Sequence, residues 1–183
     1  MPIFYMNDFW LKYNSQKSKN NPLSEILNCG NKYDRWVTIA LNYLPKEVFF
    51  ELKNKFAVFS TAERDACRIA PAISKERQII LLSDRILPKR GASEENADVR
   101  YFIFCLLHEI AHVFKNHRSP FLDGLTKTEM DVQESEANEL ALNWFNNFIK
   151  SRKNSYLKPI EIGEIERSKI IMQKLMKDLY END

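Results

Sequence analysis

Residues 100–112 read RYFIFCLLHEIAH, and the expected architecture of the whole chain is built around this segment. Its side chains are apolar on nearly every side, which predicts a largely buried helix from about residue 96 to residue 116. His108, Glu109 and His112 are the charged or polar exceptions in the apolar part of this helix. Burying such groups alone is costly, so these three side chains are expected to serve a metal or another partner.

The five residues from His108 to His112 form an HExxH motif. Positions i and i+4 of a helix lie on the same face, so the imidazoles of His108 and His112 are able to bind one ion. Neutral imidazole is a common zinc ligand, and Zn2+ is therefore the expected cofactor. Glu109, rotated by about 100° from His108, is placed to activate a zinc-bound water. The motif predicts a zinc metalloendopeptidase.

A catalytic zinc site needs a third protein ligand and one open position. The metzincin pattern HExxHxxGxxH is excluded, because Lys115 and Arg118 replace its glycine and its third histidine. His117 is the only other histidine, and on a continuing helix it would point about 160° away from the first two. We therefore interpret His117 as a surface residue at a fraying helix end.

The next predicted helix, residues 129–150, offers three glutamates near its start that could supply an acidic ligand. Measured from the centre of its apolar stripe, Glu134 lies at about 50°, Glu136 at about 110° and Glu139 at about 170°. Glu134 is the expected third ligand, as in gluzincins, and Glu136 is its rival. Asn138, one turn after Glu134, is a candidate hydrogen-bonding partner for a ligating histidine.

The segments RYFIFCLLHEIAH and ESEAN together resemble the motifs of the ImmA/IrrE metallopeptidase family. The resemblance covers roughly residues 78–148 and is specific in these two motifs. It implies a minimal zincin fold of the gluzincin type, with zinc bound by His108, His112 and Glu134. It also implies Glu109 as the general base and a regulatory protein, such as a DNA-binding repressor, as the substrate. Nothing in the first 75 residues matches the family, so the resemblance constrains substrate choice least.

The chain is expected to consist of a flexible N-terminal part and a folded domain. Residues 1–22 are predicted to be an N-terminal segment and a flexible link, because they end in a polar run closed by Pro22. Residues 23–183 are expected to form a single metallopeptidase domain. Its fold class is predicted as α+β: mostly helical, with a small β-sheet packed on the HExxH helix.

Short elements are predicted around the two long helices. The apolar spacing favours a helix over 33–44 and a further helix after Pro45. Strands at 56–60 and 78–83 are expected to pair, and a last amphipathic helix covers about 162–180. Because many zincins bind an extended peptide along a sheet edge, the strand at 78–83 is a candidate for substrate binding.

A residue that stabilises the transition state is not evident from the motifs. No histidine is available for this task beside the expected metal site. The candidate donors are Tyr101, Tyr156, Arg100 and Arg152, and each is equally compatible with a structural role.

Bulk properties restrict the partners and the compartment. The formal net charge is +2 with acidic and basic residues interleaved, so no direct nucleic-acid binding is expected. Three cysteines without a CxxC pair favour a reducing compartment, and no apolar run is long enough to cross a membrane. A cytoplasmic location, no membrane contact and a protein substrate as partner are therefore expected.

Two other functions remain open from the sequence. A hydrolase of the SprT type also carries HExxH, but it usually adds a zinc-ribbon or basic module, and CxxC pairs are missing here. A non-catalytic regulatory or antitoxin-like interaction protein could retain the zincin fold. The intact Glu109 counts against this second alternative, because a structural zinc site has no use for a general base.

Overall fold

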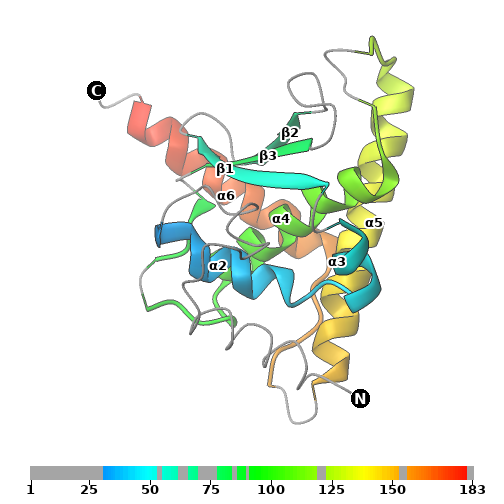
Figure 1. Ribbon diagram of the computed structural model, residues 1–183. Helices are drawn as coiled ribbons and strands as arrows, with labels where there is room; N and C mark the ends of the chain where they lie inside the picture. The colour runs from blue at the N-terminus through cyan, green and yellow to red at the C-terminus, as the bar shows by residue number, and fades with distance from the viewer. Residues whose placement is uncertain are drawn as a thin grey trace.

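A computed structural model describes residues 31–52, 55–61, 66–69, 78–83, 86–89, 91–118, 123–152 and 156–180. The predicted segment and link at 1–22 lie outside the described residues. In chain order, the described elements are α2 (Asn31–Leu41), α3 (Lys46–Leu52), β1 (Phe56–Thr61), β2 (Ala66–Ile69), β3 (Gln78–Ser83), α4 (Ala97–Lys115), α5 (Lys127–Ser151) and α6 (Ile162–Tyr180). Helices dominate and the sheet is small, which confirms the predicted α+β class (Figure 1).

The three described strands form one mixed sheet in the order β1-β3-β2. β1 runs parallel to β3, with Phe56 opposite Gln78, and the predicted pairing of these two strands is confirmed. β2 pairs antiparallel with β3, with Ala66 opposite Leu82. The sequence-based prediction lacks β2, because four residues give too short a run for periodicity to detect.

The order of the strands corrects one expectation about substrate binding. β3 lies in the middle of the sheet and is hydrogen-bonded to β1 on one side and to β2 on the other. A strand with both sides paired has no backbone edge to offer, so the predicted addition of a substrate strand to 78–83 is wrong. The outer strands of the described sheet are β1 and β2.

Helix α4 lies at the centre of the described structure, where it contacts α2, α3, α5, α6, β2 and β3 (Figure 1). Thirteen of its nineteen residues are buried, which confirms the prediction of a largely buried helix. Phe102, Ile103, Leu106 and Leu107 are fully inaccessible to solvent. Burial of each such side chain contributes about 1.5–3 kcal/mol, so the packing that stabilises the fold also fixes the position of the HExxH motif.

Helix α5 packs along α4 and begins with a capping box. The Thr126 side chain accepts a hydrogen bond from the Glu129 backbone N–H, and the Glu129 carboxylate accepts one from the Thr126 N–H. This arrangement satisfies two otherwise unpaired backbone donors and sets the first turn of the helix. Ala137 and Ala141 are completely buried, and such small side chains allow close approach to a neighbouring helix.

The segment between α5 and α6 is tied down at Ile160 by a pair of hydrogen bonds. The Asn146 side chain donates to the Ile160 carbonyl at 3.0 Å and accepts from its backbone N–H at 2.7 Å. These bonds place the start of α6 beside α4, which α6 contacts. Ile160 and Ile165 are themselves buried in the core.

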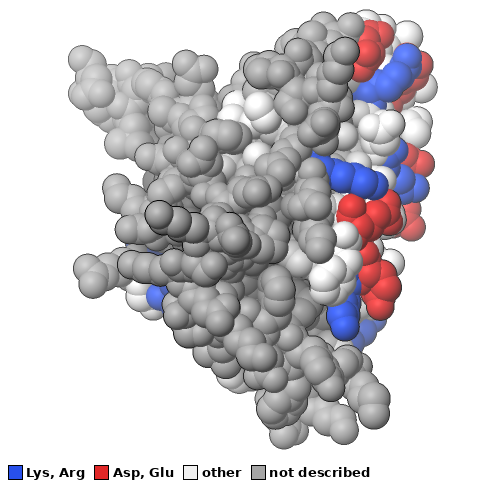
Figure 2. All heavy atoms as spheres, viewed as in Figure 1, with Lys and Arg blue, Asp and Glu red and all other residues white. Residues whose placement is uncertain are grey.

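Acidic and basic side chains are mixed on the surface that the structure describes. Figure 2 shows both signs side by side along the edge where Figure 1 places α5. The described residues along this edge therefore present no single-sign stripe of the kind that a nucleic-acid backbone attracts. None of the described helices is long and apolar enough to cross a membrane.

Candidate metal centre

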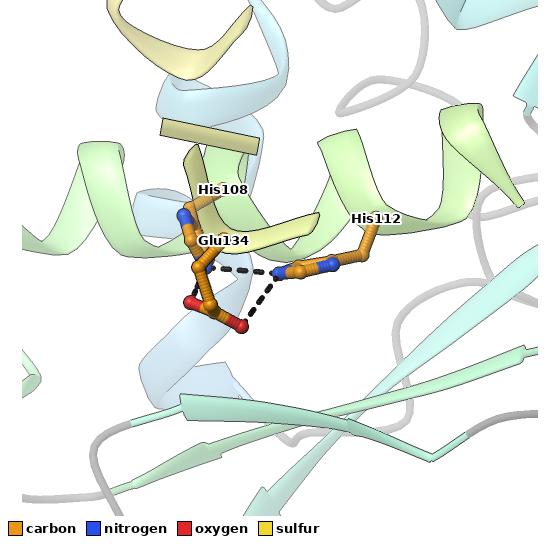
Figure 3. Close-up of side chains that lie close together, drawn as sticks. All are labelled: His108, His112 and Glu134. Atoms are coloured by element: carbon orange, nitrogen blue, oxygen red, sulfur yellow. Dashed lines mark hydrogen bonds and ion pairs between the residues drawn. The ribbon is translucent and has the colours of Figure 1, made fainter. Parts of the chain in front are cut away.

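Three side chains converge where α5 lies against α4. The Nε2 atoms of His108 and His112, both on α4, are 3.0 Å apart. Glu134 on α5 places Oε2 3.2 Å from the first Nε2 and Oε1 3.4 Å from the second. Figure 3 shows the two rings projecting from α4 toward this carboxylate. His108, His112 and Glu134 could together hold a metal ion.

The spacing of these donors fits a small tetrahedral cation. Ligands bound at roughly 2.0–2.1 Å to a tetrahedral zinc lie about 3.3 Å from one another. The three separations between these donor atoms, 3.0, 3.2 and 3.4 Å, bracket that value. Two Nε2 lone pairs at 3.0 Å would repel each other, so a proton or a cation must lie between them. Two imidazoles and one carboxylate are also the donor set of many catalytic zinc sites.

Helix geometry explains why these three side chains meet. His108 and His112 are one turn apart on α4, so their rings lie one above the other on one face. Glu134 lies three residues before the buried Ala137, on the side of α5 that approaches α4. The rings are largely buried, with exposed side-chain fractions of 13% and 10%, whereas the Glu134 side chain is 57% exposed. The centre is therefore open toward solvent beside Glu134.

The ionisation of Glu134 and His112 suits metal binding. Hydrogen bonds from His108 and His112 lower the pKa of Glu134 well below its usual value, which keeps the carboxylate charged. Burial lowers the pKa of His112, and the nearby rings of His108 and His117 add to this effect. A deprotonated carboxylate and a neutral imidazole are the forms that bind a cation.

His108 behaves differently in the protein without an ion. Burial opposes its charged form, but the hydrogen bond with Glu134 and the charge of Glu109 outweigh burial and raise the pKa of His108. Asn138, the residue predicted to support a ligating histidine, also raises this pKa. Nδ1 of His108 is nevertheless buried without a partner of hydrogen-bonding geometry in the described part of the chain. The raised pKa reflects a proton shared with Glu134, which is the position a cation would take.

Glu109, the predicted general base, is buried at 8% exposure on α4. Its charge acts on His108, which places the carboxylate close to the metal centre. It is separate from the three side chains that converge as potential ligands. A general base must lie within hydrogen-bond reach of the proton that it takes, so the role of Glu109 stays a prediction.

The predicted role of His117 as a surface residue is wrong. Its exposure is only 7%, and Nδ1 lies 2.8 Å from Nδ1 of His112. The reason is that α4 ends at Lys115, and Asn116 then adopts a left-handed conformation with φ of 52°. The chain turns back, and the His117 backbone N–H bonds to the His112 carbonyl at 3.0 Å. Projection along a continuing helix therefore does not apply to His117.

The three glutamates of the ligand search have three different environments. Glu134 is the one that approaches the rings of both His108 and His112. Glu136 instead binds His117, with Oε2 3.0 Å from its Nε2. Glu139 is exposed. The angular projection therefore selects Glu134 correctly as the glutamate beside the histidine pair, but it misses the contact between Glu136 and His117.

The arginines proposed as transition-state donors are engaged elsewhere. Arg100 is buried and bonds the Glu164 carboxylate and the carbonyls of Lys158 and Pro159. Arg152 forms an ion pair with Glu94 at 3.1 Å. Neither guanidinium is available to a substrate at the metal centre, because each holds a structural contact.

The tyrosines proposed for the same task have contrasting environments. Tyr101 is buried in the core at 4% exposure, and Tyr156 is exposed at 73%. Tyr156 lies in the segment before α6 and lines a surface pocket with Arg100 and Lys158, away from the three converging ligands. Burial in the core and placement in that pocket favour structural and surface roles for these two residues.

No protein-family model matches this chain, and no curated protein or solved structure shows a significant similarity to it.

Proposed function

We propose that this protein is a zinc-dependent metallopeptidase of the gluzincin type. The observation that carries the proposal is the convergence of His108, His112 and Glu134, with the Glu109 carboxylate beside them. The donor set favours zinc, since two imidazoles and a carboxylate with spacings near 3.3 Å suit its tetrahedral geometry. An HExxH helix buried on most sides is the expected support for such a centre.

Each residue then has a defined task. His108, His112 and Glu134 hold the ion, and a bound zinc would supply a Lewis acid and a water of lowered pKa. Glu109 takes a proton from the attacking water and delivers it to the amine of the leaving peptide. The buried apolar residues of α4 fix the helix that carries Glu109 and the two rings, which reduces the reorganisation needed during the reaction.

The substrate is proposed to be a regulatory protein, such as a DNA-binding repressor, on the strength of the resemblance to the ImmA/IrrE family. An extended substrate segment requires an exposed backbone edge, and among the described strands β1 and β2 hold the outer positions. The mixed charges over α5 favour a protein rather than a nucleic acid as the molecule bound directly.

Cleavage of a peptide library tests the proposed activity. Zinc-loaded wild type is expected to generate new peptide termini, identified by mass spectrometry, whereas Glu109→Gln binds zinc and loses at least about 100-fold in rate. Glu139→Gln, an exposed glutamate on α5, is the matched control and is expected to cleave like wild type. Equal cleavage by wild type and Glu109→Gln would contradict the mechanism. Normal zinc content without any new termini would instead favour the non-catalytic interaction protein.

A further inference from the structure

A chain of hydrogen-bonding groups leads away from the metal centre behind His112. His112 Nδ1 lies 2.8 Å from His117 Nδ1, and His117 Nε2 lies 3.0 Å from Glu136 Oε2. The two rings meet edge to face, with centroids 4.9 Å apart and an interplanar angle of 71°. His117 is buried, while the Glu136 side chain is 46% exposed. The chain therefore runs from a buried ligand to a carboxylate at the surface.

The backbone holds His117 in this position. Asn116 caps α4, and its N–H bonds to the carbonyls of His112 and Val113. The next N–H, that of His117, bonds to the same His112 carbonyl. The left-handed turn at Asn116 brings the His117 ring against His112 instead of continuing along the helix. Main chain and side chain of His117 thus both contact the proposed ligand.

The positions of the protons follow from what a metal requires. To bind an ion through Nε2, His112 must carry its proton on Nδ1. Nδ1 of His112 is then a donor, so Nδ1 of His117, 2.8 Å away, must be the acceptor. His117 then carries its own proton on Nε2 and donates it to the Glu136 carboxylate. Each contact has one donor and one acceptor, and only this direction leaves Nε2 of His112 available.

We propose that His117, held by Glu136, is a positioning residue that fixes the orientation and the Nδ1–H tautomer of His112 for metal binding. The inference deepens the proposed function, since it rests on His112 being a zinc ligand. Hydrogen bonds from outer groups to ligating histidines orient the ring and increase its basicity, and their loss typically costs about 10–100-fold in metal affinity. The three residues His112, His117 and Glu136 form a relay that sequence periodicity does not predict.

The two ligating histidines differ in this respect. Nδ1 of His112 has the relay, whereas Nδ1 of His108 has no partner of hydrogen-bonding geometry among the described residues. The relay is therefore expected to act on the orientation of His112, whereas Asn138 and Glu134 are the residues that act on His108. Loss of the relay is expected to weaken zinc binding through His112 and to leave the general base Glu109 in place.

Four variants separate this role from ordinary packing. His117→Phe keeps a ring of similar size without an acceptor, while His117→Asn keeps an oxygen near the position of Nδ1. Glu136→Gln changes the exposed end of the relay and leaves the core intact. Glu139→Gln changes a neighbouring exposed glutamate of the same helix and is the control. Circular dichroism and thermal melts establish that each variant is folded.

Zinc dissociation constants from competition with a chromophoric chelator are the first measurement. We expect His117→Phe to bind zinc about 10–100-fold more weakly than wild type, with His117→Asn recovering part of this loss. Glu136→Gln should lose more than about twofold, and Glu139→Gln should match wild type. A change within twofold in both His117→Phe and Glu136→Gln would overturn the proposal. If His117→Phe does not fold, Glu136→Gln alone decides the outcome in the same way.

Nuclear magnetic resonance reports the tautomer of each imidazole, which a purely structural role of His117 would not determine. The chain has three histidines, so long-range 1H–15N spectra of the zinc-loaded protein contain three imidazoles. We expect the His112 proton on Nδ1 and the His117 proton on Nε2, and the opposite tautomer at either ring would overturn the relay. Absence of zinc binding by wild type would overturn both the relay and the proposed function. If zinc is bound with these tautomers but no peptide is cleaved, the proposed function is contradicted and the relay is not.

Discussion

Arg100 on α4 and Glu164 on α6 form a two-point ion pair between residues 64 positions apart in sequence. Nε lies 2.6 Å from Oε1, and Nη2 lies 3.1 Å from Oε2. Nη1 of the same guanidinium also donates to the Lys158 carbonyl at 2.9 Å. A planar fork that binds a carboxylate and main-chain carbonyls at once fixes the first turn of α6 against the central helix.

Loss of this ion pair should destabilise the fold. Glu164→Gln leaves the Arg100 guanidinium, 8% exposed, without its opposite charge, while the Glu164 side chain itself is 29% exposed. We expect the free energy of unfolding to fall by about 1–3 kcal/mol, below the range for a fully buried pair because solvent screens Glu164. Urea denaturation measures this change in the free energy of unfolding. Glu166→Gln, an exposed neighbour on α6, should stay within about 0.5 kcal/mol of wild type.

Glu134 should control how much zinc the protein binds. Elemental analysis of purified wild type is expected to give one zinc per chain. The zinc affinity of Glu134→Gln, measured by chelator competition, should fall by more than the roughly 10–100-fold that is typical when an outer hydrogen-bonding partner is lost. Zinc at 100 times its dissociation constant should stabilise wild type by about 2.7 kcal/mol. Glu139→Gln is the control on the same helix. Equal zinc content in Glu134→Gln and wild type would remove Glu134 from the ligand set.

Tyr43 should make stability fall at alkaline pH. Its hydroxyl donates to Glu94 at 2.6 Å, and burial, together with this bond, raises the pKa of Tyr43 above its usual value. The folded state then keeps the proton while the unfolded chain loses it above about pH 10. The contribution is therefore complete below pH 10 and is lost as the pH rises, by up to about 1.4 kcal/mol per pH unit.

A comparison of two tyrosine variants measures this alkaline effect. The difference in unfolding free energy between wild type and Tyr43→Phe should narrow as the pH rises above about 10. The corresponding difference for Tyr156→Phe, at a residue that is 73% exposed, should stay constant. A constant difference for Tyr43→Phe as well would show that the proton of the buried hydroxyl does not stabilise the fold.

Asn116 should be replaceable by glycine but not by a β-branched residue. Its φ of 52° lies in the left-handed region, which glycine and asparagine adopt readily. Asn116→Gly is expected to leave the melting temperature close to that of wild type. Asn116→Val is expected to lower the free energy of unfolding by about 1–2 kcal/mol. Thermal melts of the two variants test this, and equal stability would show that the turn tolerates other conformations.

The long helices and the grouping of His108, His112 and Glu134 can be predicted from the sequence because they follow regular helical periodicity. The apolar pattern around residues 100–112 predicts α4, and the angular position of Glu134 on α5 predicts its approach to the two histidines. Both inferences use only the regular geometry of a helix interior. The class of fold follows in turn from the number and length of such segments.

The features that sequence analysis missed depend on irregular backbone. Projection along a continuing helix places His117 on the wrong side, because the left-handed turn at Asn116 reverses the chain. Asparagine just beyond a helix is nevertheless a recognised stop signal. Arg100 reaches Glu164 through tertiary packing that no local pattern encodes. The short strand β2 acquires its conformation by pairing with β3 and not from its own sequence pattern.

The exposure of Glu134 has a kinetic consequence for the ion. The imidazoles of His108 and His112 are anchored in a helix that only unfolding would displace, whereas the carboxylate can swing into water by a rotation about its own bonds. A cation arriving from solvent would meet the exposed Glu134 carboxylate before it reached the two buried rings. Entry or release of a metal would then require rotation of the Glu134 side chain and the making or breaking of bonds to the two rings, but no unfolding of the helix that carries them.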